Sequence, residues 1–359
     1  MKKFTVTLLS VLFMVAMGAG SAFAGGQKEA PSQKGASSAS AAAPALKVGM
    51  VADVGGLNDH SFNQLTYQGL VDAEKQLGVK GTAVVATGQS DYVPDMTRFA
   101  KDGYDLVIGV GFLMKDAVDQ VAKEYPNVKF LLIDEPITGI ANVTSAVFAS
   151  QQIGFLAGAL AALVEQDTSL NLPGLRHNNT IGVVGGMQIP PVDVYMAGYF
   201  QGARYIDPKI TVLHGYTGNF NDPASGKSLA LAQHSKGADI VYQLAGGTGL
   251  GVIQAAKDSG FYAIGADSNQ AYLSPEHVLT STSKLVNVAV FDTVKNLQEG
   301  KFDAGVVTYD LQNKGVDISP VLASVPQTIV DKVNALKQQI IDGKITVSPK
   351  IPDWVTTGK

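Results

Sequence analysis

From Leu46 onward, short apolar runs rich in valine and isoleucine alternate with stretches in which apolar residues recur at helical spacing. The apolar runs predict strands at Leu46–Asp53, Thr82–Thr87, Asp105–Gly111 and Val128–Asp134. Apolar stripes predict helices between these strands, at Phe62–Leu77, Val93–Lys101 and Lys115–Tyr125. Repeated alternation of strand and helix is typical of a parallel sheet covered by helices.

The same alternation then starts again. It predicts helices at Ile153–Glu165, Val192–Tyr205, Ala224–Ser235 and Gly249–Ser259. Each helix leads to a predicted strand, at Thr180–Gly185, Ile210–Tyr216, Asp239–Ala245 and Tyr262–Asp267. Two successive halves of similar size predict an α/β protein with two doubly wound parallel-sheet lobes. The segment Asn171–Asn179 is expected to be a surface loop.

The C-terminal part has too few elements for a third domain. It predicts strands at Val278–Lys284 and Val306–Leu311 and helices at Val286–Leu297 and Pro326–Asp342. We expect the chain to return to the first lobe and come back, so that three crossings form the hinge. The N-terminal lobe is then 46–148 plus 284–310, and the C-terminal lobe is 149–283 plus 311–359. The only tryptophan, Trp354, is expected to pack the tail against a lobe.

The first 24 residues have the pattern of a secretory signal peptide. Lys2 and Lys3 precede the apolar run Phe4–Val15, and small residues end in Ala22-Phe23-Ala24. Residues 25–45 are small, polar and proline-containing, which predicts a flexible linker. We therefore expect export to the periplasm or to the outer face of the cytoplasmic membrane. The sequence contains no cysteine, so we expect neither a lipid anchor on cysteine nor a thiolate metal site.

Composition narrows the class of partner. The formal net charge is −4 and there are no basic runs, which argues against nucleic-acid binding. The 46% hydrophobic and 16% charged content is that of a globular protein. We expect a monomer whose ligand lies between the two lobes.

Polar residues directly follow several predicted strands. Ligands of open α/β sheets bind beyond the carboxyl ends of the strands, and Asp53, Asp134 and Asp267 each lie there. A single carboxylate at such a place is typical of a helix cap, but three at equivalent strand ends indicate a ligand site. Gly246 and Gly247 follow another strand and allow a ligand to approach the backbone.

The first strand–helix loop, Asp53–Gln64, is unusually long and contains two consecutive glycines. Asp59 or Ser61 can cap the helix that follows. Phe62, at the start of that helix, is either a core residue or an exposed stacking face, and periodicity alone favours the core.

This loop, with DVGG followed by SFNQ, resembles the basic membrane protein family of ABC-transporter binding proteins, the nucleoside-receptor group also called purine nucleoside receptor A-like. The resemblance continues in order to the C-terminus. The segments that carry it are Gly154–Gly158, Gly182–Pro190, Tyr216–Pro223, Gly246–Gly251, Gly265–Gln270 and Val278–Lys284.

The resemblance implies a type I periplasmic-binding-protein fold with a three-segment hinge. It implies an exported receptor that binds a nucleoside, with purines favoured, and delivers it to a membrane permease and its ATPase. Two phenyl rings would sandwich the base, three polar side chains would bind its edge, two charged side chains would hold the ribose hydroxyls, and two glycines would allow close approach to the sugar. In that order these residues are Phe62 and Phe220; Asp53, Asn63 and Asp134; Asp267 and Lys284; and Gly246 and Gly247.

Other patterns were weighed against this interpretation. The string Asn221–Ser228 looks like a phosphate-binding loop but lacks its first glycine, and Gly246–Gly251 is an incomplete dinucleotide fingerprint. The five histidines lack zinc-ligand spacing. We therefore expect no enzyme, catalytic residue, metal or cofactor. The alternatives left open are a receptor for a sugar or signalling molecule, a secreted nucleoside-processing enzyme, and an adhesin.

Overall fold

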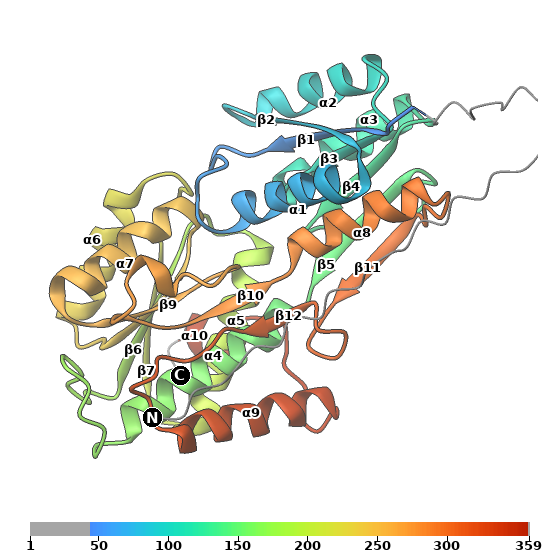
Figure 1. The fold of residues 1–359 in the computed structure, drawn as a ribbon. Helices are drawn as coiled ribbons and strands as arrows, with labels where there is room; N and C mark the ends of the chain where they lie inside the picture. Colours follow the sequence, from blue (N-terminus) through green and yellow to red (C-terminus); the bar gives the residue numbers. More distant parts are fainter. Residues whose placement is uncertain (1–43, 358–359) are drawn as a thin grey trace, which may run out of the picture. The chain divides into compact units, whose positions relative to one another are not determined.

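Two lobes, each built on a six-stranded sheet, make up residues 44–357, the part of the chain that the computed structural model describes (Figure 1). The predicted signal peptide, 1–24, and residues 25–43 of the predicted linker lie outside the described residues.

The first lobe has the strand order β11-β5-β4-β3-β1-β2, and its neighbouring strands run parallel. Its strands are β1 (Lys47–Ala52), β2 (Lys80–Val85), β3 (Leu106–Gly109), β4 (Lys129–Ile133), β5 (Val143–Phe148) and β11 (Gly305–Tyr309). Its helices are α1 (Phe62–Leu77), α2 (Tyr92–Lys101), α3 (Lys115–Glu124) and α8 (Val286–Gln298).

The second lobe has the strand order β12-β10-β9-β8-β6-β7, parallel except for the edge strand β12. Its strands are β6 (Thr180–Gly185), β7 (Thr211–Tyr216), β8 (Ile240–Leu244), β9 (Tyr262–Gly265), β10 (Val278–Lys284) and β12 (Val316–Ile318). Its helices are α4 (Ser150–Gln166), α5 (Pro190–Ile206), α6 (Pro223–Ser235), α7 (Gly249–Ser259), α9 (Gln327–Ile341) and α10 (Asp353–Thr357).

Helices cover both faces of each sheet, which is why the central strands are apolar on both sides. In the first lobe, α1 and α8 pack on one face and α2 and α3 on the other. In the second lobe, α4, α5 and α9 pack on one face and α6 and α7 on the other. Close packing of α4 on α5 depends on glycine, because a Cβ on Gly158 would collide with the carbonyl oxygen of Tyr199.

The chain passes between the lobes after β5, after β10 and after β11. These strands and β12 lie at one end of the two sheets, so the passages lie together, and β2 and β7 form the opposite edges. The predicted two-lobed, parallel-sheet α/β fold is thus confirmed. Two strands escaped prediction: β5 follows β4 without an intervening helix, and β12 is only three residues long.

Trp354 packs the C-terminal helix α10 against the second lobe, as expected. Its ring meets the ring of Phe200 edge-on, with centroids 5.6 Å apart. The guanidinium carbon of Arg204 lies 3.6 Å from the centroid of the same indole, a cation–π contact.

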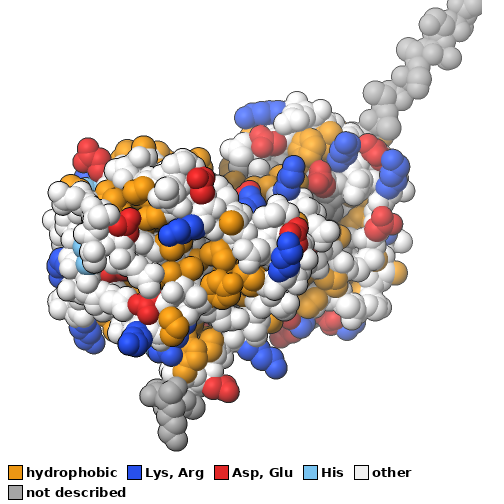
Figure 2. All heavy atoms as spheres, turned by 90° about the horizontal axis from the view of Figure 1, so that it is seen from below, with side chains coloured by type: hydrophobic (Ala, Val, Ile, Leu, Met, Phe, Trp, Pro, Cys, Tyr) orange, Lys and Arg blue, Asp and Glu red, His pale blue; other side chains and the backbone are white. Residues whose placement is uncertain are grey.

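The outer surface carries charges of both signs (Figure 2). Within residues 44–357, no helix is long and apolar enough to cross a membrane. On the face seen from below, basic and acidic side chains are interspersed, and apolar side chains gather near its middle (Figure 2).

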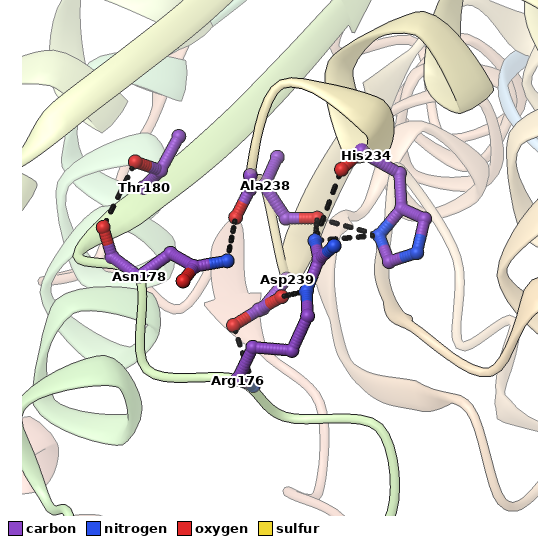
Figure 3. Close-up of polar contacts among 7 residues, drawn as sticks. Arg176, Asn178, Thr180, His234, Ala238 and Asp239 are labelled. Atoms are coloured by element: carbon purple, nitrogen blue, oxygen red, sulfur yellow. Dashed lines mark hydrogen bonds and ion pairs between the residues drawn. The ribbon is translucent and has the colours of Figure 1, made fainter.

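The segment between α4 and β6 has no regular secondary structure, as predicted for the loop at 171–179. Arg176 makes several of the contacts that hold this segment against the rest of the second lobe (Figure 3). The backbone N–H and the Nε of Arg176 donate to the two carboxylate oxygens of the fully buried Asp239, at 2.7 and 2.6 Å. Its Nη2 donates to the carbonyl oxygens of His234 and Ala238, at 3.0 and 3.2 Å.

A buried acid lies near this arginine, at the end of α4. Glu165 is 2% exposed. Burial raises its pKa from 4.5 to about 8, and the negative charge of Asp239 acts in the same direction. Because the folded protein holds this proton more tightly than the unfolded chain does, the group costs stability as pH rises from 4.5 through about 8.

We therefore expect Glu165→Gln to be more stable than the parent at alkaline pH. The difference between the two free energies of unfolding should vanish near pH 4.5 and grow up to about pH 8. Urea unfolding of both proteins across this pH range measures it. Replacement of the exposed Glu276 by Gln serves as the control and should show no such trend. A pH-independent difference for Glu165→Gln would contradict the assignment.

Candidate ligand-binding cleft

A cavity lies between the two lobes, lined by residues from the carboxyl ends of strands in both sheets. Of the predicted site residues it brings together Asp53, Phe62, Asn63, Asp134, Phe220, Gly246, Asp267 and Lys284. Gly247 is not part of its lining. A Cβ on Gly247 would instead lie 3.1 Å from the carbonyl oxygen of Phe220, a tight contact within the second lobe.

The loop after β1 forms one wall and is held by its own side chains. Asp53 Oδ1 accepts hydrogen bonds from the backbone N–H of Gly55, at 2.9 Å, and from Asn63 Nδ2, at 2.6 Å. Burial raises the pKa of Asp53, and these two hydrogen bonds oppose the rise. Since its amide nitrogen faces a carboxylate, Asn63 turns Oδ1 away, and that buried oxygen has no protein partner.

Asp59 caps α1, as the sequence allowed. Its carboxylate accepts hydrogen bonds from the backbone N–H groups of Ser61, Asn63 and Gln64, at 2.9–3.0 Å. These are among the N–H groups that a helix start leaves without partners. Burial raises the pKa of Asp59 to about 6 despite the three donors.

Asp134 and Asp267 occupy equivalent places in the two lobes. Asp134 follows β4 and Asp267 follows β9, the third strand from the hinge edge in each sheet. Both adopt a left-handed backbone conformation, with φ of 72° and 65°. Aspartate tolerates this conformation better than most residues, and such strain gathers at functional sites. The two strand ends are therefore shaped to aim a carboxylate into the cleft.

The two carboxylates have different partners. Lys284, the last residue of β10, places Nζ 2.6 Å from Asp134 Oδ2, and the lysine side chain is 2% exposed. Burial raises the pKa of Asp134, and the ammonium of Lys284 opposes the rise. The resemblance groups Lys284 with Asp267 as the two charged residues for the ribose, whereas the ammonium forms its ion pair with Asp134. The pair also joins the lobes, since Asp134 belongs to the first and Lys284 to the second.

Three aromatic rings surround the same ammonium. Lys284 Nζ lies 5.0 Å from the ring centroid of Phe62, 5.2 Å from that of Phe148 and 5.3 Å from that of Tyr195. Such contacts stabilise a cation through the negative faces of the rings. Phe62 is half-buried: it packs on the first lobe's core and also lines the cavity.

Phe220, also half-buried, comes from the loop between β7 and α6 of the second lobe. It lies over Gly186, where an added Cβ would collide with its ring. Gly246, with φ of 53°, lies beside it. The cavity therefore carries one phenyl ring from each lobe.

Asp267 is held by hydroxyls rather than by a cation. Tyr195 OH donates to its Oδ1 at 2.8 Å, and Ser61 Oγ donates to its Oδ2 at 2.7 Å. Tyr195 belongs to the same lobe, whereas Ser61 belongs to the other. Burial and the charge of Asp267 raise the pKa of Tyr195 well above its usual value, so this hydroxyl stays protonated and donates.

Several lining residues were not predicted. Asp59 was seen only as a cap, and Tyr195 was not singled out within the predicted helix Val192–Tyr205. Five further ones form apolar parts of the wall: Phe112, Leu113, Ile189, Pro191 and Val192. They follow β3 and β6, so their position after a strand was the available signal.

No group of three or more His, Cys, Asp or Glu side chains within the described residues is arranged to hold a metal ion. The string Asn221–Ser228 is the start of α6, where the Asp222 carboxylate caps the N–H groups of Ala224 and Ser225. That arrangement is an ordinary helix cap.

The ion pair yields a test of stability. Replacing Lys284 by Met leaves the carboxylate of Asp134 buried without its cation, so we expect the free energy of unfolding to fall by about 3 kcal/mol. The double variant Lys284→Met with Asp134→Asn should recover more than half of this loss. Urea unfolding measures both. Lys301→Met removes a cation that is paired on the surface, where water screens the pair, and should change the stability little. A loss in Lys284→Met no larger than the loss in Lys301→Met would contradict the burial argument.

Comparison with known proteins identifies the family to which this sequence is similar. The family model for PnrA-like ABC transporter substrate-binding proteins, Bmp, matches residues 46–350. The ABC transporter nucleoside-binding protein BmpA of Lactococcus lactis subsp. cremoris is 37% identical over 327 residues, which are 85% of this chain and 90% of that protein. An uncharacterized lipoprotein of Pyrococcus horikoshii, PH1714, is 35% identical over 76% of this chain and 68% of its own length.

A solved structure of an ABC transporter solute-binding protein has the same fold. A solute-binding protein of an ABC transporter system from Aeropyrum pernix K1 superposes with a TM-score of 0.78 at 28% identity, over 84% of this chain and 92% of that one. The type I periplasmic-binding-protein fold that the sequence resemblance implied is thereby confirmed. The match of the family model over most of the chain leads to one conclusion: this protein belongs to the Bmp family of ABC transporter substrate-binding proteins.

Proposed function

We propose that this protein binds a nucleoside between its two lobes and delivers it to an ABC permease. The observation that carries the proposal is a cleft in which each lobe supplies one half-buried phenyl ring and a set of hydrogen-bonding side chains. A flat base needs a stacking face, and a ribose needs acceptors and donors for its hydroxyls. The name of the Lactococcus relative, a nucleoside-binding protein, is in line with this ligand class.

Each polar group then has a chemical role. The unpartnered Asn63 Oδ1 and the carboxylate of Asp53 can accept N–H groups from the edge of the base. Asp267 can accept from ribose hydroxyls while Tyr195 and Ser61 hold it. Lys284 has three N–H donors, of which Asp134 takes one, so it can also donate to a hydroxyl. The resemblance assigns Asp134 to the edge of the base. Its ion pair with Lys284 occupies part of the carboxylate, so only its remaining lone pairs can accept hydrogen bonds from a ligand.

Transport follows from the two-lobed construction. A ligand that contacts both lobes binds the closed form better than the open form, and only such a difference can shift the equilibrium towards closure. Phe62 and Phe220 come from opposite lobes, so both would reach the same ligand only in the closed form.

The decisive experiment is mass spectrometry of small molecules released by denaturing the purified protein, followed by calorimetry with inosine and guanosine. We expect a nucleoside in the released fraction and binding of the added nucleosides. Recovery of a pentose without a base would contradict the proposal in favour of a sugar receptor. Steady release of free base during incubation would show an enzyme instead.

The stacking rings are tested by Phe62→Ala and Phe220→Ala. Each should weaken nucleoside binding roughly 10- to 100-fold, because a stacked base contributes about 1–3 kcal/mol. Titration calorimetry measures the affinity. Tyr205→Ala removes an exposed ring from the outer side of α5 and should leave binding unchanged. Unchanged affinity in both phenylalanine variants would contradict the sandwich.

The charge of the cleft predicts its selectivity. Asp53, Asp59, Asp134 and Asp267 line it with Lys284 as the accompanying cation, and that cation is already paired. A phosphate dianion would be repelled here, since like charges placed together cost several kcal/mol. We expect inosine 5′-monophosphate to bind at least roughly 100-fold more weakly than inosine. Equal affinities in parallel calorimetric titrations would contradict this.

A further inference from the structure

The loop before α1 contacts the second lobe at the rim of the cavity, and of the predicted ligand-binding side chains these contacts include only Asp267. His60 and Ser61, of the first lobe, meet the segment 266–272 of the second lobe, which runs from the end of β9 into a short helical turn. We propose that these segments form a latch, which closes the two lobes on each other through protein contacts alone. This proposal goes beyond ligand identity, because every contact in it joins protein to protein.

Five hydrogen bonds make up the latch. The carbonyl oxygen of His60 accepts from Ser268 Oγ at 2.8 Å and from Gln270 Nε2 at 3.0 Å. The imidazole Nδ1 of His60 lies 2.7 Å from Tyr272 OH. Ser61 Oγ lies 2.7 Å from Asp267 Oδ2 and 3.2 Å from the carbonyl oxygen of Ala266. A two-residue segment of one lobe thus uses backbone and side chains against a single loop of the other.

The second lobe presents its side of the latch in a fixed geometry. Gln270 is fully buried. Its Oε1 accepts from Gln243 Nε2 at 2.7 Å and from the backbone N–H of Ala266 at 3.1 Å, while its own N–H donates to Ser281 Oγ at 3.0 Å. Because these bonds fix the amide, Nε2 points at the first lobe before contact is made. A preorganised donor loses little entropy when it binds.

The first lobe also holds its side of the latch in a defined conformation. His60 adopts a left-handed backbone conformation, with φ of 53°. Its N–H donates to Gln64 Oε1 at 3.1 Å, and the carboxylate of Asp59 holds the N–H of Ser61 at 3.0 Å. A strained conformation in a non-glycine residue persists where surrounding contacts determine it. Here that conformation turns the His60 carbonyl outward, towards Ser268 and Gln270.

The latch is joined to the ligand cavity through Asp267, which lines the cavity and accepts from Ser61. The lobes also approach closely beside it, where a Cβ on Gly247 would lie 3.9 Å from Asp59 Cβ. Closure therefore completes the hydrogen bonding of a cavity carboxylate. A latch of this kind populates a closed form in the absence of ligand, and it slows both entry and release once the lobes are closed.

Distance measurement by electron spin resonance tests the latch without ligand. The chain has no cysteine, so the pair Gln89→Cys and Ala224→Cys takes two spin labels at defined places. Gln89 follows β2 and Ala224 begins α6 after β7, so both exposed residues lie on the side farthest from the hinge. Opening of the lobes should lengthen this distance. We expect a short-distance population in ligand-free protein that was refolded after denaturation.

The variant Ser268→Ala with Tyr272→Phe removes two hydroxyls of the latch. It should lower the ratio of closed to open molecules roughly tenfold, as expected for two neutral hydrogen bonds. The matched control, Ser235→Ala with Tyr104→Phe, removes hydroxyls that bond within one lobe and should leave the ratio unchanged. Tyr272→Phe alone, at a side chain that is 60% exposed, should shift the ratio in the same direction without affecting folding.

Two results would overturn the latch. One is a distance distribution in the Ser268→Ala, Tyr272→Phe variant that matches the control. The other is ligand-free parent protein that shows only the long distance. Neither depends on nucleoside binding, so failure of the proposed ligand would leave this measurement intact. As a second readout, inosine should dissociate faster from the latch variant than from the control.

Discussion

The arrangement of the rest of the cleft depends on the buried ion pair between Lys284 and Asp134. A charge removed from water is tolerable only when it is paired and hydrogen-bonded. The ends of β4 and β10 must therefore meet, although they belong to different lobes. Rings from α1, β5 and α5 then enclose the ammonium, so that helices and strands from both lobes converge on one atom.

That convergence distinguishes two carboxylates that the topology makes equivalent. Asp134 and Asp267 follow corresponding strands and share a left-handed conformation. One is neutralised by a cation from the other lobe, and the other is held by two hydroxyls, of which one also comes from the other lobe. The same structural element thus occurs twice with different chemistry. Asp134 forms an ion pair, and Asp267 is suited to accepting hydrogen bonds from a neutral ligand.

The sequence predicted most of the fold because alternating strand and helix patterns are local. Strand β5 was missed since no helix separates it from β4, and β12 since it is short. The predicted site residues other than Gly247 gather in one cavity because the ends of parallel strands lie at one edge. The ion-pair partner of Lys284 could not be predicted from the sequence. Asp134 and Asp267 both follow equivalent strands, and only the relative placement of the lobes determines which of them meets the ammonium. Tyr195 was missed for a similar reason, because an apolar helical stripe does not reveal which of its hydroxyls faces a carboxylate.

Closure of a binding protein is a balance between contacts in the open and closed forms. If the ligand supplied all of the closing free energy, the apparent affinity would be reduced by the rarity of the closed form. Contacts between His60–Ser61 and residues 266–272 lower that penalty, since they are made by protein alone. They cannot be very strong, because a permanently closed receptor neither admits nor releases its ligand. Four of the five latch contacts, all but that of Ser61 with the Asp267 carboxylate, are hydrogen bonds between neutral groups. Each contributes little, and together they bias the equilibrium without locking it.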